Sequence, residues 1–240
     1  SCFNYIEMLN SSNKIIASLN SKATQIFKNN CRYIFKEEEK TTGDMYNKQN
    51  QFNYETAKLY AHIFLPKDTI CNEKIKTHYE SKKSKNIAGI DKRKEQLKTL
   101  FFNPGAKIKG IPFLGDKLNV YDSNALEYYD YSLDQVQFNN KNCFEFKIEA
   151  KKNLTNFQRT KIIIDHITTW LDVQNFEIVG REYALSYNAL FYDFNVQVYV
   201  EMTNYKNKLV PNLMRYKGNW KLLFNKREKA NFTATLFNFK

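Results

Sequence analysis

The most constraining feature of this sequence is a strict alternation of apolar and polar residues near its C-terminal end. Between residues 190 and 202 every second residue is apolar, and those between are mostly polar, with Phe191 and Tyr199 as exceptions. A period of two over such a length is typical of an antiparallel β-strand with one buried face. The chain therefore contains a strand roughly 40 Å long whose apolar face needs a cover.

Similar segments precede and follow this strand. We expect further strands at residues 127–138, 143–150, 161–171, 176–187, 209–216, 219–224 and 227–239. Short stretches rich in Asn and Asp, such as 139–142 and 204–207, provide the turns between them. No helical pattern interrupts this series, so it predicts an antiparallel meander rather than βαβ units.

The first third of the chain carries a different pattern. Apolar residues between positions 5 and 28 recur at spacings near three, four and seven, which indicates an amphipathic helix over 5–28. These residues are Ile6, Leu9, Ile16, Leu19, Ala23, Ile26 and Phe27. After it we expect a strand at 31–36, a turn at 37–43 and a strand at 59–65 that Pro66 ends. Residues 96–102 predict another strand, and 108–118 an irregular loop.

These patterns predict a fold of the α+β class that is mainly β and forms a single domain over residues 1–240. The antiparallel meander of 31–240 curves into an open or unclosed β-barrel, and the helix at 5–28 lies against its concave face. Apolar residues make up 42% of the chain, which is ample for a core. No apolar run approaches the length of a membrane-spanning helix, about 20 residues.

The formal net charge of +12 is distributed unevenly. Its densest part is a Lys-rich segment at 74–98. The basic residues there are Lys74, Lys76, Lys82, Lys83, Lys85, Lys92, Arg93, Lys94 and Lys98. The segment is either a solvated surface loop or a contact for an anionic surface such as lipid headgroups. Nucleic-acid binding is the less favoured alternative, because the chain is poor in Arg, the residue best suited to bidentate recognition.

Cysteine and histidine spacing excludes a zinc cluster. Cys2, Cys31, Cys71 and Cys143 lie far apart, without a C-x-x-C pair, so we expect no metal and no cofactor. Disulfides fit an oxidising compartment, but the sequence does not pair them. A small residue followed by Cys2 is what remains after cleavage of a bacterial lipoprotein signal, which would make Cys2 a lipidation site. A boundary unrelated to such processing fits equally well.

No local motif indicates catalysis. The sequence has no nucleophile elbow, HExxH zinc motif, dinucleotide fingerprint, phosphate loop or EF-hand loop, and we expect no enzymatic activity. Aromatic residues instead admit two interpretations, as the lining of a ligand cavity or as ordinary core. They are Tyr128, Tyr129, Tyr131, Phe144, Phe146, Tyr192 and Phe194.

The hairpin over residues 168–183 resembles a hairpin of a known protein family. Its first strand ends in Trp170, Leu171 and Asp172, and its second strand contains Arg181. Together with the strand order, it resembles the LolA/LolB-like superfamily of outer-membrane lipoprotein-sorting proteins, especially uncharacterised members from Bacteroidetes. The resemblance implies an unclosed half-barrel with a helical lid, in the periplasm or at the outer membrane. It also implies an acyl chain or lipid in the apolar concavity. The Lys-rich segment departs from the family pattern.

The sequence thus predicts a non-enzymatic envelope protein that binds a hydrophobic ligand, with lipid or acyl chain as partner. The predicted lining residues of the concavity are Phe144, Phe146, Ile148, Tyr192, Phe194, Val196, Val198 and Met202. Lipid headgroups would meet the Lys-rich segment, and lipidated Cys2 would anchor the protein to the membrane. The alternative is an interaction or scaffold domain, in which the same face is merely core.

Overall fold

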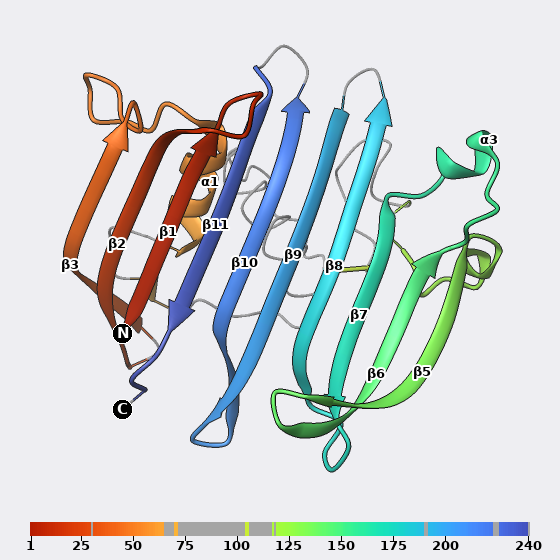
Figure 1. Ribbon diagram of the computed structural model, residues 1–240. Helices are drawn as coiled ribbons and strands as arrows, with labels where there is room; N and C mark the ends of the chain where they lie inside the picture. Colours follow the sequence, from red (N-terminus) through yellow and green to blue (C-terminus); the bar gives the residue numbers. More distant parts are fainter. Residues whose placement is uncertain are drawn as a thin grey trace.

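The computed structural model describes residues 1–29, 31–64, 70–71, 104–105, 117, 119–189, 192–222 and 226–239. Its main element is a single antiparallel sheet of eleven strands (Figure 1). The strands are β1 Cys2–Leu9, β2 Ile15–Lys28, β3 Cys31–Gly43, β4 Ile70–Cys71, β5 Tyr129–Phe138, β6 Lys141–Ala150, β7 Ile164–Asp172, β8 Ile178–Ala189, β9 Tyr192–Tyr205, β10 Lys208–Leu222 and β11 Glu228–Leu236. The helices are short: α1 Glu55–Phe64, η2 Ser123–Glu127 and α3 Asn156–Arg159.

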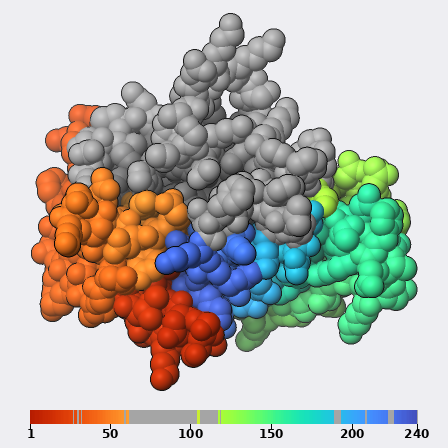
Figure 2. All heavy atoms as spheres, turned by 90° about the horizontal axis from the view of Figure 1, so that it is seen from above, coloured from red at the N-terminus to blue at the C-terminus, as the bar shows by residue number. Residues whose placement is uncertain are grey.

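Strands β5 to β11 lie in chain order, which confirms the predicted meander. Beyond β11 the order continues with β1, β2, β3 and β4, so the N-terminal strands extend the sheet past the C-terminal strand. The two ends of the chain meet in the sheet, where the Ser1 amino group donates to the Phe237 carbonyl at 2.9 Å. Among the described residues the outer strands β4 and β5 do not pair with each other, so the sheet is not closed into a barrel. Seen from above, β1–β3 and β5–β7 lie at opposite ends of the molecule (Figure 2).

The prediction of an N-terminal helix is wrong, because residues 5–28 form β1, a turn and β2. Every second residue of β1 is buried, but one of these is the polar Asn4. Ser21 is likewise buried on β2, and Asn4 donates to its hydroxyl at 3.5 Å. Because polar residues occupy some of the buried positions, the apolar residues alone do not show the period of two of these strands. Asn10 makes the turn, since its side chain accepts from the Ser12 and Lys14 amides.

Three other predicted elements differ from the structure. Residues 37–43, predicted as a turn, continue β3, where cross-strand ion pairs such as Lys22–Glu37 (2.9 Å) hold charged residues in the strand. Residues 59–65, predicted as a strand, belong largely to α1, which ends shortly before Pro66. Residues 209–216 and 219–224 were predicted as two strands, but β10 runs unbroken from Lys208 to Leu222. The predictions for 74–98 and 96–102 lie outside the described residues, as does nearly all of 108–118.

One face of the sheet, which we call the core face, carries the apolar side chains. A single row of register partners crosses eight strands on this face, and all its members are buried. The row is Ile148, Ile167, Tyr183, Val198, Tyr216, Phe232, Ile6 and Leu19. Intervening residues such as Glu182, Tyr199 and Arg215 lie on the opposite face. The sheet therefore has one apolar, buried face and one more exposed face that is mostly polar, as the alternating sequence requires.

Helix α1 covers part of the core face, behind β1 and β11 in Figure 1, and its Tyr60 contacts β10 and β11. The Tyr60 ring lies 4.8 Å from the rings of both Tyr216 and Phe232. At the helix N-terminus the Glu228 carboxylate accepts from the backbone amides of Glu55 and Thr56, at 2.9 and 2.8 Å. A carboxylate there satisfies amides that have no partner within the helix and complements the helix dipole.

Strand β3 carries a disulfide-bonded cysteine. Cys31 is disulfide-bonded, and Cys71 on β4 is its register partner. Cys143 is free and buried.

We predict that replacing Cys31 with Ser lowers the free energy of unfolding by about 2–5 kcal/mol, the range for removal of a native disulfide. Guanidinium unfolding of both proteins, with and without reductant, measures this difference. Reductant should destabilise the wild-type protein and leave Cys31→Ser unchanged. Alkylation of four thiols in the denatured, unreduced wild-type protein would contradict the prediction.

Candidate functional site

All eight residues predicted to line a concavity occupy register positions on the core face. They do not form one uniform surface. Ile148, Val196 and Val198 are buried in the hydrophobic core, where the protein's own side chains pack around them. The others whose side chains are described are half-buried: Phe194 and Met202 nearer the ends of β9, and Phe144 and Phe146 in the middle of β6, next to the outer strand β5. The centre of the core face is thus core, and partly exposed apolar surface lies towards its margins.

Two polar groups lie on the core face between these apolar residues. Arg181 donates from Nε to the Thr169 hydroxyl at 3.0 Å, and desolvation by burial lowers the pKa of its guanidinium. Tyr183, two residues further along β8, is fully buried. Its hydroxyl has no hydrogen-bond partner among the described residues, and burial raises its pKa well above the usual value. The face is therefore not uniformly apolar.

A pocket of about 380 Å³ opens at the end of the sheet where β8 ends and β9 begins. Its apolar part is formed by Phe194 and Tyr187, whose ring centroids are 6.0 Å apart and which both pack against the core. Its polar part includes Arg159 and Asp193. Arg159 pairs with Asp165, and Asp193 pairs with Arg227, so these charges are neutralised within the protein. Phe194 connects this pocket to the core face.

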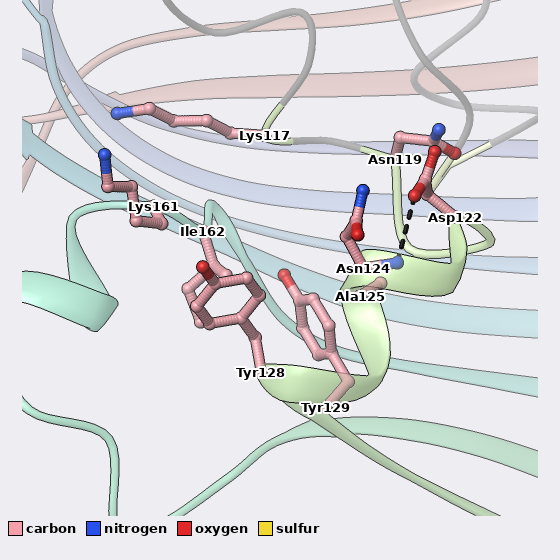
Figure 3. A pocket seen from close by; sticks show the side chains of 9 residues that line it. All are labelled: Lys117, Asn119, Asp122, Asn124, Ala125, Tyr128, Tyr129, Lys161 and Ile162. Atoms are coloured by element: carbon pink, nitrogen blue, oxygen red, sulfur yellow. Dashed lines mark hydrogen bonds between the residues drawn. The ribbon is translucent and has the colours of Figure 1, made fainter.

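A second pocket, of about 270 Å³, lies between η2 and the segment that leads from α3 into β7 (Figure 3). It is lined by Lys117, Asn119, Asp122, Asn124, Ala125, Tyr128, Tyr129, Lys161 and Ile162. Asp122 is engaged, since its carboxylate accepts from the Asn124 amide as the N-cap of η2. Lys117 donates to the Thr160 carbonyl at 2.6 Å and to the Tyr187 hydroxyl at 2.8 Å, so it links the two pockets.

Only part of these two pockets is predictable from the sequence. Tyr128, Tyr129 and Phe194 were among the aromatic residues considered as cavity lining, and each lines one of the two pockets. The lysines Lys117 and Lys161 were missed. They come from segments about 40 positions apart, and no local motif joins them.

The other predicted contacts are the Lys-rich segment and Cys2. The Lys-rich segment at 74–98 lies outside the described residues. Cys2 is buried in β1, where its thiol accepts from the Asn4 side chain at 3.2 Å, and its lipidation stays a prediction. Within the described part of the chain no group of His, Cys, Asp and Glu residues has the arrangement of a metal site. None of the helices described has both the length and the hydropathy needed to cross a membrane.

Comparison with known proteins assigns no family. No protein-family model matches the sequence, and no curated protein matches it. Two solved structures cover 99% of this chain at 9% identity. One is a DUF1329 family protein from Desulfovibrio piger, covered over 83% of its length with a TM-score of 0.28. The other is a putative outer membrane lipoprotein-sorting protein domain from Vibrio parahaemolyticus, covered over 82% with a TM-score of 0.30. At these scores the two structures carry no argument about this chain.

We predict that Tyr183→Phe leaves the free energy of unfolding unchanged or raises it by up to about 1 kcal/mol, because a buried hydroxyl without a partner is removed. The matched control is Tyr129→Phe. The Tyr129 hydroxyl is also buried but donates to the Ile164 carbonyl at 3.2 Å, so its loss should cost about 1 kcal/mol. Urea unfolding of both variants measures these changes in the free energy of unfolding. A larger loss of stability for Tyr183→Phe than for Tyr129→Phe would show that the Tyr183 hydroxyl has a partner.

Proposed function

We propose that the protein binds an acyl chain or another hydrophobic ligand on the core face of its unclosed sheet and catalyses no reaction. The observation that carries this proposal is the one-sided apolar surface of the half-barrel, which still has half-buried aromatic residues on β6 and β9. Half-buried Phe146 and Phe194 provide apolar area that a ligand would remove from water.

The pocket at Phe194 is the proposed entrance for the chain. It joins open solvent to the core face, and its apolar wall is aromatic, while its charged groups Arg159 and Asp193 are each paired with a residue outside the lining, Asp165 and Arg227. A hydrocarbon chain that passed from there along the face would gain roughly 0.8 kcal/mol for each methylene group buried. The buried centre of the face limits the ligand to the half-buried ends unless core side chains move.

The proposed location is the cell envelope. The disulfide of Cys31 supports it, because structural disulfides form and persist in oxidising compartments outside the cytoplasm. Lipidation at Cys2 and a contact of the Lys-rich segment with an anionic membrane belong to the same proposal. Neither is needed for ligand binding on the core face.

We predict that purified protein releases lipid into an organic extract, detectable by mass spectrometry, and that delipidated protein takes up a fluorescent fatty acid. Phe194→Glu should weaken this uptake at least ten-fold, because a charge would have to be buried against the chain. The matched control is Phe35→Glu. Phe35 lies on the opposite face of the sheet, on β3, and is 54% exposed, so its replacement should leave uptake unchanged.

Two results would overturn the proposal. Absence of lipid from the extract together with absence of fatty-acid uptake would favour the interaction domain, in which the core face serves packing alone. Equal losses for Phe194→Glu and Phe35→Glu would show that the fatty acid binds elsewhere. Thermal unfolding of each variant confirms that the fold is retained.

A further inference from the structure

We propose that the corner formed by η2, α3 and the second pocket is a docking surface for an anionic lipid bilayer. We call it the η2–α3 corner and define it by Leu126, Phe157, Lys151, Lys152 and Lys161. The inference is independent of ligand binding on the core face and of the Lys-rich segment.

The corner exposes two large apolar side chains on neighbouring elements. Phe157 on α3 is 71% exposed and Leu126 on η2 is 62% exposed, the first the most exposed of the large apolar residues described. The two elements adjoin, because the Gln158 side chain donates to the Glu127 carboxylate at 3.4 Å. Side chains of this kind, raised above a polar surface, insert into the interfacial region of a bilayer.

Basic residues surround these apolar side chains. Between residues 151 and 163 the chain has four basic residues, Lys151, Lys152, Arg159 and Lys161, and no acidic one. The Lys161 ammonium lies 4.7 Å from the centre of the Phe157 ring, and Lys151 donates to the Leu126 carbonyl at 2.8 Å. Charge and apolar surface are thus interleaved. Such an arrangement suits a bilayer surface, where the lysines contact anionic headgroups and the apolar side chains contact acyl chains.

The second pocket gives the corner a place for a headgroup phosphate (Figure 3). Lys117, Lys161, Asn119 and Asn124 can all donate to an anion there. Asp122, the acidic residue of the lining, is turned to the Asn124 amide. A volume of about 270 Å³ is ample for a phosphate group. Acidic residues near the corner that oppose binding include Glu127, engaged by Gln158, Asp165, paired with Arg159, and Glu149, two residues before Lys151.

The test is flotation of the full chain with vesicles of phosphatidylcholine alone or of equal parts phosphatidylcholine and phosphatidylglycerol. We expect binding to the anionic vesicles only, weakening as salt rises, because surface charges are screened within a Debye length. Lys151→Gln, Lys152→Gln and Lys161→Gln together should weaken it about 100-fold, at roughly five-fold for each lysine. Leu126→Ser with Phe157→Ser should weaken it at least ten-fold.

Matched controls separate the corner from the general positive charge of the protein. Lys14, Lys48 and Lys217 are exposed elsewhere, and their replacement with Gln changes the net charge equally. Phe176, 65% exposed in the β7–β8 turn at the far end of β7, and Ile15, 54% exposed, match the apolar pair. These controls should bind as wild type. Failure of the wild-type protein to float, equal flotation with both vesicles, or equal losses in corner and control variants would each overturn the proposal.

Discussion

The pairing of the first strand with the last is the interaction on which the rest of the structure depends. Eight residue pairs join β1 to β11, from Cys2 opposite Leu236 to Leu9 opposite Lys229. This ladder attaches the N-terminal hairpin to the C-terminal meander and makes one sheet of two parts that lie far apart in sequence. It also continues the buried row from Phe232 to Ile6, so the core face passes without a break between them. Helix α1 then docks across β10 and β11 through Tyr60.

In a single sheet with one apolar face, the centre of that face and its ends have different roles. Its centre must be filled to be stable, and Ile148 and Val198 are buried there. Its ends are less completely covered, and there the structure has half-buried aromatic residues, the two pockets and the η2–α3 corner. Both proposals draw on these ends, because the fold can leave apolar surface accessible there at little cost to the core. If the η2–α3 corner docks on a membrane, the pocket at Phe194, which is the proposed entrance for the ligand, lies close to that membrane, because Lys117 links the two pockets.

The meander was predictable from sequence, and the N-terminal hairpin was not. Strands β5 to β9 alternate clearly, and their turns carry asparagines such as Asn139 and Asn140, which adopt the left-handed backbone that a two-residue hairpin turn requires. In β1 and β2 the buried positions include Asn4 and Ser21, so apolar spacing alone favoured a helix. Among the residues that line the two pockets, the sequence predicted only aromatic ones such as Tyr128 and Phe194. Lys117 and Lys161 come to line one pocket only through folding, and no local motif predicts that they do.

What the sequence by itself determined is local: which segments alternate, where they turn, and that one face of a long antiparallel sheet is apolar. These properties depend on neighbouring residues and on the two-residue period of a strand. The tertiary structure alone decided that β1 adds to β11, that Cys31 lies opposite Cys71, and that the centre of the face is filled while its ends stay partly open. Those outcomes depend on contacts between residues far apart in the chain. Such contacts form where they bury the most apolar area over the whole chain, and the sequence of a single segment does not contain that information.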